Sequence, residues 1–164
     1  MTLQERFNEA FKYIDGKLFW KINTNKSKDL IGQEAGCKSS GSYGLVNLDK
    51  VSYCIHKVVF CMHHGFIPVV IDHINGNSKD HRIENLRASD HTTNNCNKAF
   101  QKNNTSGVKG LTWSKQAKKW QARITFKKKH HHLGYFECKD DATEFLTLAR
   151  ETLHGDFANH GVFA

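Results

Sequence analysis

The chain has 164 residues, enough for one ordinary domain or two small ones, and its formal net charge is +8 at pH 7. Hydrophobic residues make up 38% of it, so it can fold, although neither half can build a large core. No stretch approaches about 18 consecutive apolar residues, and the first residues lack a charged region followed by an apolar run. We therefore expect no membrane span, no secretory signal and a cytoplasmic protein.

The cysteines also favour a reduced compartment. There are five, an odd number, and they form no Cys-x-x-Cys pair: Cys37, Cys54, Cys61, Cys96 and Cys138. Residues 54–64 contain two of them and three histidines, but the spacing differs from that of a standard zinc knuckle. We therefore expect no structural zinc site.

The N-terminal segment has two readings. Apolar residues at helical spacing predict an amphipathic helix over residues 2–14: Leu3, Phe7, Ala10, Phe11 and Ile14. Asp15-Gly16 is a hairpin-type turn before a strand at residues 17–22, so the second half of this segment is alternatively the first strand of a hairpin. Residues 23–42 are polar and rich in Gly, Ser and Lys, which predicts a weakly ordered loop.

A hairpin and a helix follow. Residues 43–48 and 51–55 flank Asp49-Lys50, which predicts a short hairpin. Residues 56–64 predict a helix with Gly65 as its stop.

The next thirty residues carry the most informative pattern in the chain. An apolar run over residues 66–71 predicts a short buried strand that ends in Asp72 and His73. Asn75-Gly76 forms a turn, and residues 86–88 predict a second strand. Ser89 is the expected N-cap of a helix over residues 90–97. The result is a hairpin folded onto a helix.

This arrangement brings together groups that suit phosphodiester hydrolysis. Asp72 offers a carboxylate oxygen and Asn94 a carbonyl oxygen, and such an oxygen pair with open positions suits Mg²⁺ or another divalent cation such as Mn²⁺. His73 has an imidazole whose ordinary pKa is near neutrality, so it can take a proton from water as a general base.

The same residues resemble the HNH (ββα-metal, His-Me finger) endonucleases, particularly phage-borne homing-type members. An isolated Asp-His pair is more often structural, but this long ordered set is specific. The resemblance implies His73 as the general base and Asp72 with Asn94 as metal ligands. It also implies that the side-chain amide of Asn85 ties the loop between the strands. We expect no role for the nearby His81 and His91, because histidines on loops and helix faces are commonly only solvated.

Positive charge is concentrated in one block. Residues 97–132 contain ten basic residues and no acidic one, so the remainder of the chain is net −2 (8 minus 10). Such a block can be a solvated face, but beside a phosphodiester site it indicates contact with a polyanion. Residues 98–106 have no apolar periodicity and predict a basic linker between two modules.

The C-terminal segment predicts a sheet covered by one helix. Apolar and polar residues alternate over residues 120–126, and residues 108–113 and 130–136 predict the flanking strands. The following helix has an apolar face and stops at Gly155, with these residues turned to the sheet: Ala142, Phe145, Leu146, Ala149 and Leu153. The sheet's other, basic face is then available for the DNA major groove.

Residues 106–160 resemble the APETALA/ethylene-response-factor type of DNA-binding domain. Matching pieces include Val108-Lys109-Gly110-Leu111 and Leu133-Gly134-Tyr135-Phe136. The resemblance implies these DNA-facing positions: Lys109, Thr112, Ser114, Arg123, Thr125, His130 and His132. Several of them are Arg or Trp in the plant proteins, so the plant target sequence does not transfer.

The sequence therefore predicts an α+β protein with an HNH module over residues 1–97, whose ββα-metal core spans about 69–97. A linker at 98–106 joins it to an APETALA-type domain at 107–160, a three-stranded antiparallel sheet packed on one helix. The predicted function is a site-specific, homing-type endonuclease acting on double-stranded DNA with one divalent metal. A monomer would nick, and a double-strand break would need two protomers or two events. The alternative is a non-catalytic, sequence-specific DNA-binding regulator.

Overall fold

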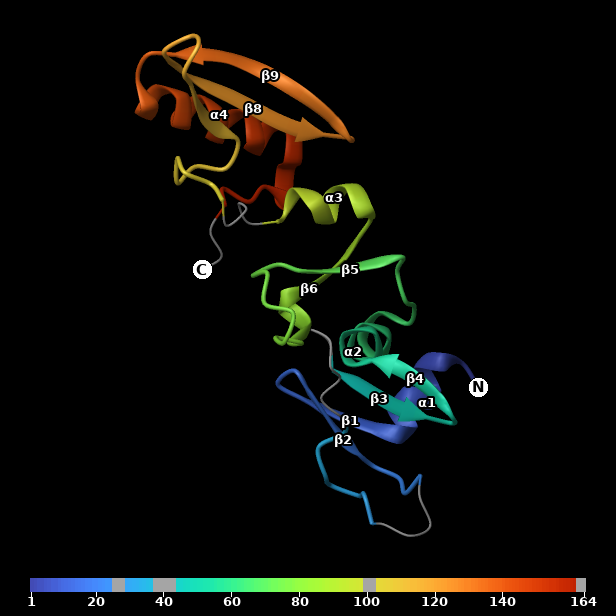
Figure 1. The fold of residues 1–164 in the computed structure, drawn as a ribbon. Coiled ribbons are helices and arrows are strands. Elements are labelled where there is room, and N and C mark those ends of the chain that lie inside the picture. The colour runs from blue at the N-terminus through green and yellow to red at the C-terminus, as the bar shows by residue number, and fades with distance from the viewer. Residues whose placement is uncertain (25–28, 37–43, 99–102, 162–164) are drawn as a thin grey trace. The chain divides into compact units, whose positions relative to one another are not determined.

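The computed structural model describes residues 1–24, 29–36, 44–98 and 103–161 (Figure 1). The fold is α+β, with helices and small antiparallel sheets, in agreement with the sequence prediction. The chain forms two compact units, Met1–Ser89 and Asp90–Ala164. Parts of the predicted loop and linker, and Cys37, lie outside the described residues.

The N-terminal segment forms a short helix followed by a hairpin, which is the second of the two structures that its sequence allows. Helix α1 (Leu3–Ala10) begins at a capping box in which Thr2 and Glu5 satisfy each other's backbone N–H groups. Strand β1 (Phe11–Ile14) then pairs antiparallel with β2 (Lys17–Trp20). Asp15 and Gly16 take positive φ angles of 45° and 81°, as a tight hairpin turn requires. The turn therefore overrides the helical spacing of residues 11–14.

The rest of the first unit follows the predicted order. Strands β3 (Leu45–Leu48) and β4 (Val51–Cys54) form a hairpin, and α2 (Ile55–His64) ends at Gly65 in the left-handed conformation. Strand β5 (Val70–His73) is shorter than the predicted apolar run and pairs antiparallel with β6 (Leu86–Ser89), which follows the 3₁₀ turn η1 (Ile83–Asn85).

One core holds the first unit together. It includes apolar residues from α1, the hairpins and α2, among them Phe7, Phe11, Leu18, Val58 and Val59, and it extends to Ile71 of β5 and Leu86 of β6. The β5–β6 hairpin is thus anchored in the apolar core by one buried apolar side chain from each strand, which holds the end of β5 in place.

The second unit begins with α3 (His91–Cys96). Its N-cap is Asp90, whose carboxylate accepts hydrogen bonds from the backbone N–H groups of Thr92 and Thr93. The predicted cap, Ser89, lies in β6 instead. The prediction was wrong because β6 continues one residue further, and a carboxylate at the next position caps the helix equally well. Whereas the sequence prediction kept this helix with the preceding strands, the structure groups it with the C-terminal residues.

The C-terminal sheet and helix agree with the prediction. Strands β7 (Leu111–Ser114), β8 (Lys119–Phe126) and β9 (Lys129–Phe136) form an antiparallel sheet in that order. Helix α4 (Lys139–His154) lies along one face, followed by η2 (Gly155–Phe157) (Figure 1). The main cluster of buried apolar side chains in this unit is small: Leu111, Ala122, Ala142 and Leu146.

Phe145 differs from its predicted place. We expected it to face the sheet, but its side chain is 46% exposed and rests against the ring of Phe136, with ring centroids 5.5 Å apart. Ala142 and Leu146 already fill the contact with β8, so Phe145 lies at the margin of the core. Within the described residues, no helix is both long and apolar enough to span a membrane.

Candidate active site

Asp72 and His73 end strand β5 and are both buried, with 4% and 6% of their surface exposed. The antiparallel register places Asp72 opposite Arg87 and His73 opposite Leu86. Ionisable side chains are seldom buried to this extent without partners. The partners of each residue therefore decide what the site can do.

Arg87 is the partner of Asp72. Its guanidinium donates from Nε and Nη2 to the same carboxylate oxygen, Oδ2, at 2.8 and 2.7 Å. Both side chains are largely buried, which strengthens the charge interaction relative to a surface pair. The pair fixes the orientation of the Asp72 carboxylate at the strand end.

Two further histidines surround His73. Its Nε2 lies 3.4 Å from Nδ1 of His81, and the His56 ring centroid lies 5.4 Å from that of His73. Each of these three residues offers one nitrogen that can bind a metal ion, and the three nitrogens lie within 4.8 Å of one another. Among the described residues, they form the candidate metal-binding group of His, Cys, Asp or Glu side chains. From the sequence we expected no role for His81, because no local pattern indicates that residues 56, 73 and 81 meet.

Burial makes all three imidazoles weaker bases. It lowers the pKa of His56 to about 3, and the proximity of His73 and His81 adds to this shift. Burial also lowers the pKa of His73, although the nearby carboxylates of Asp72 and Asp80 partly oppose the effect. The pKa of His81 falls mainly for the same reason. At neutral pH the three rings are therefore uncharged, and His73 is in the form that accepts a proton.

These buried rings predict an acid-sensitive first unit. In the unfolded chain His56 is protonated below pH 6.5, whereas in the folded chain it is protonated only near pH 3. The free energy of unfolding therefore decreases as the pH is lowered from 6.5 towards 3. The slope approaches about 1.4 kcal/mol per pH unit from this residue alone. Urea unfolding of the chelator-treated protein between pH 7.5 and 5 tests this. His56→Gln should flatten the dependence, and an equal slope in the variant would refute the assignment.

Asn85 ties the loop between the two strands, as the resemblance to HNH endonucleases implies. Its Oδ1 accepts from the backbone N–H of Asn75, and its Nδ2 donates to the backbone carbonyl of Asp80, both at 2.9 Å. The backbone N–H of Ile74 also donates to the carbonyl of Asn85. One buried amide therefore holds both ends of the loop that follows His73.

Replacing this amide should loosen the loop. In Asn85→Ala, a backbone N–H and a backbone carbonyl in the loop lose their partner, and we expect a loss of about 2–4 kcal/mol in the free energy of unfolding. The matched control is Asn77→Ala, since Asn77 is exposed and its side-chain oxygen accepts from the Lys79 N–H within the same loop. Urea unfolding of both variants gives the comparison, and equal midpoints would show that the Asn85 amide does not support the loop.

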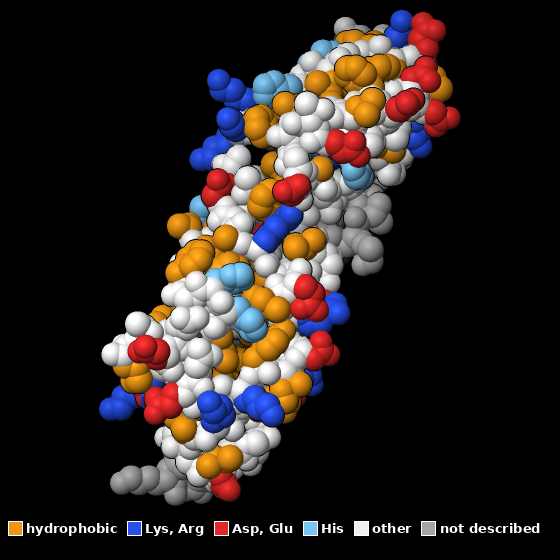
Figure 2. Space-filling view, turned by 180° about the vertical axis from the view of Figure 1, so that it is seen from behind, with side chains coloured by type: hydrophobic (Ala, Val, Ile, Leu, Met, Phe, Trp, Pro, Cys, Tyr) orange, Lys and Arg blue, Asp and Glu red, His pale blue; other side chains and the backbone are white. Residues whose placement is uncertain are grey.

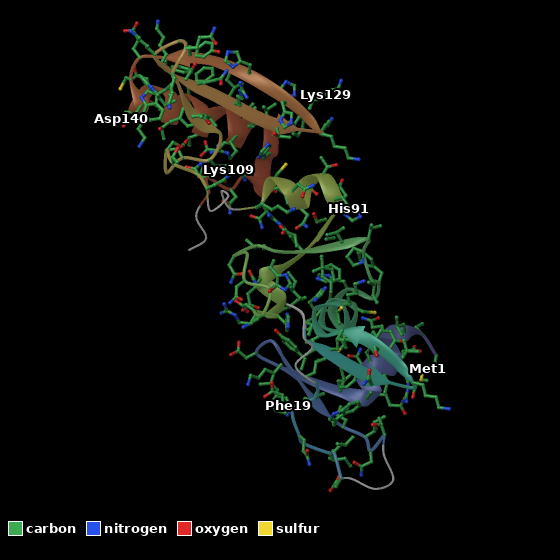
Figure 3. All side chains as sticks on the ribbon, in the orientation of Figure 1. Met1, Phe19, His91, Lys109, Lys129 and Asp140 are labelled. Atoms are coloured by element: carbon green, nitrogen blue, oxygen red, sulfur yellow. The ribbon has the colours of Figure 1, made fainter. Side chains whose placement is uncertain are left out.

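The third residue of the predicted site, Asn94, is half-buried in α3 of the second unit. Within that unit, Lys109 holds the end of α3: its ammonium donates to the carbonyl of Cys96 at 2.9 Å, to that of Lys98, and to that of Asn159 at 3.3 Å. Burial lowers the pKa of Lys109 to about 8. Lys109, labelled in Figure 3, was predicted to face DNA, and here its ammonium is engaged by the fold.

Most of the other predicted DNA-facing residues lie on the sheet face opposite α4. Strand alternation and pairing place these exposed side chains there: Thr112, Arg123, Thr125, His130 and His132. Ser114 is half-buried, and its hydroxyl accepts from the Ala117 N–H. Gln121, which the strand alternation already places on the polar face, and Tyr135 also lie on this face, where the Gln121 amide donates to the Tyr135 hydroxyl at 3.0 Å.

Comparisons with known proteins support the HNH domain but not the predicted type of the C-terminal domain. Residues 53–96 match a family described as HNH endonuclease, and the matched stretch contains Asp72, His73, Asn85 and Asn94. Protein 3.8 of Escherichia phage T7 is 38% identical over 90 residues, which cover 54% of this chain and 72% of the T7 protein. No solved structure matches the chain. The similarity of residues 106–160 to the APETALA type is not supported by these comparisons. The chain therefore belongs to the same family as T7 Protein 3.8 and contains an HNH endonuclease domain at residues 53–96.

Proposed function

We propose that this protein is a site-specific, homing-type DNA endonuclease that acts in the cytoplasm of a phage host. The observation that carries the proposal is the buried Asp72–His73 end of β5 within the matched HNH domain, with Asp72 oriented by Arg87 and His73 uncharged. Buried ionisable side chains in adjacent positions are concentrated at functional sites, and this strand end has two of them.

His73 is the proposed general base. A neutral imidazole accepts the proton of an attacking water, and its lowered pKa keeps that form populated at and below neutral pH. The contact with His81 restrains the ring, and the loop that follows is held by Asn85. Asn85 is thus a positioning residue rather than one that touches the reacting atoms.

The donor set also fits the divalent cation that HNH endonucleases use. Asp72 supplies a carboxylate oxygen and Asn94 an amide oxygen, both hard ligands of the kind that Mg²⁺ or Mn²⁺ prefers. Such a cation stabilises negative charge on the phosphodiester and on its leaving oxygen. The Asp72 carboxylate is held at the strand end by Arg87, so this ligand is preoriented.

Double-stranded DNA is the proposed substrate, bound by the exposed face of the β7–β8–β9 sheet in the manner of an APETALA-type domain. Arg123 can fork onto a guanine in the major groove, and Thr112, Thr125 and His132 add hydrogen-bonding groups. A polar cavity of about 510 Å³, lined in part by Lys98, Arg123 and Arg150, adds positive charge within the same unit. On the molecular face drawn in Figure 2, by contrast, basic and acidic side chains are interspersed.

A plasmid assay tests the proposal. Supercoiled plasmid DNA that contains a target is incubated with the protein in the presence and in the absence of Mg²⁺. Because each chain has one active site, we expect nicked open circles as the first product. Linear product after a lag indicates paired nicks or cooperating protomers. The competing function is a non-catalytic DNA-binding regulator, which the Asp72–Arg87 pair favours, because a buried ion pair can serve the fold alone. Salt-sensitive binding without cleavage in any divalent cation would support that regulator.

A further inference from the structure

Three histidines that the proposed reaction does not jointly require converge in the first unit. His56 lies in the first turn of α2, His73 ends β5, and His81 lies in the loop before η1. All three are buried, with 6%, 6% and 8% of their surface exposed. Three elements thus deliver three buried imidazoles to one place.

The rings are arranged around a common point. Their centroids form a nearly equilateral triangle with sides of 5.4, 5.7 and 6.0 Å. The Nε2 of His73 and the Nδ1 of His81 are 3.4 Å apart. Two nitrogens that each lie about 2.0–2.1 Å from one tetrahedral zinc ion are separated by roughly 3.3–3.4 Å. The spacing of this pair is therefore that of two ligands of a single zinc ion.

We propose that His56, His73 and His81 form a Zn²⁺ site, distinct from the oxygen ligands of the Mg²⁺ site, and that Zn²⁺ bound there inhibits the nuclease. Three neutral nitrogen ligands suit Zn²⁺ and not Mg²⁺, which prefers oxygen. A zinc ion held by His73 occupies the nitrogen lone pair that would accept the proton of water. The inhibition rests on the proposed role of His73 as the base, whereas the zinc binding does not.

Zinc binding is tested first, without DNA. The full chain is freed of metal with a chelator and titrated with Zn²⁺ by calorimetry at pH 7.5. We expect one strong site that His81→Ala and His56→Gln each weaken by at least about 100-fold, since even outer partners of a metal site contribute 10–100-fold. His64→Ala is the matched control on α2, because His64 is exposed. His132→Ala removes a member of the histidine run on β9 and should also leave the strong site intact.

Several results would overturn the site. Unchanged affinity in both His81→Ala and His56→Gln would do so, and loss of the strong site in His132→Ala would move it to strand β9. Circular dichroism of each variant in chelator establishes that it is folded, and the use of two substitutions guards against one that is not. None of these readouts depends on cleavage, so they stand even if the protein is not a nuclease.

The inhibition is tested separately. At fixed Mg²⁺, one equivalent of Zn²⁺ should stop plasmid cleavage by the wild type, a tenfold increase in Mg²⁺ should not restore it, and a zinc chelator should. The cleavage rate of His81→Ala, measured relative to the same variant without zinc, should not fall at the same Zn²⁺ concentration. Relief by Mg²⁺ would mean that zinc competes for Asp72 and Asn94, and cleavage supported by Zn²⁺ alone would make the three histidines the catalytic centre. Either result overturns the inhibitory role.

Discussion

His73→Ala is expected to lower the rate of DNA cleavage by about 100- to 10,000-fold, the usual contribution of a general base. The ring is buried at the end of β5, and burial lowers its pKa, so His73 is held in the uncharged form that a general base requires. DNA affinity should be unchanged, because the proposed DNA-binding face belongs to β7, β8 and β9. Single-turnover cleavage and gel-shift binding on the same labelled duplex measure the two effects.

The control for this variant is His64→Ala, which removes an exposed imidazole from the neighbouring helix α2. It should cleave at the wild-type rate. If His73→Ala cleaves as fast as the control, the base is another residue. If it loses DNA binding as well as cleavage, the substitution has disturbed the fold, and His73→Gln, which keeps more of the side-chain volume, decides between the two explanations.

Leu146→Ala is expected to destabilise the second unit by about 2–5 kcal/mol. Leu146 is fully buried against the sheet, in a cluster with three other buried apolar side chains, Leu111, Ala122 and Ala142. A cavity there removes a large share of the packing that holds α4 on the sheet. We therefore expect sequence-specific DNA affinity to fall together with the cooperative unfolding of this unit.

Leu148→Ala is the matched control, because Leu148 lies on the same helix but is 57% exposed. It should change the free energy of unfolding by less than about 0.5 kcal/mol. Urea titrations followed by tryptophan fluorescence report on the second unit through Trp113 and Trp120 in its sheet, and comparison of the two variants cancels the contribution of Trp20 in the first unit. Equal midpoints for the two variants would show that α4 is not held by this core.

Local chemistry explains what the sequence could predict. Turn residues such as Asp49-Lys50 and the stop at Gly65 define hairpin and helix ends within a few residues. The order Asp72, His73, Asn85, Asn94 was sufficient to predict the HNH domain that the family comparison supports. The N-cap was predicted at Ser89 instead of Asp90 because both residues are good caps. The length of strand β6, which includes Ser89, determines which of the two begins the helix.

What the sequence could not predict depends on contacts between distant residues. The Asp72–Arg87 pair follows from the register of β5 on β6, and no local signal specifies that register. The meeting of His56 with His73 and His81 depends on how α2 packs beneath the hairpin. Lys109 looks from sequence like one more member of a basic block, whereas its three carbonyl partners come from residues 96, 98 and 159.

The central claim is that this chain cuts DNA at a defined position with a divalent cation. The most direct test is an end-labelled duplex that the protein binds in a gel shift, incubated with Mg²⁺ or with EDTA and analysed on a denaturing gel, one strand labelled at a time. The account predicts a single discrete cut in one strand with Mg²⁺, its loss in EDTA, and its loss in His73→Ala. Intact strands in every divalent cation, on DNA that the protein demonstrably binds with sequence preference, would contradict it.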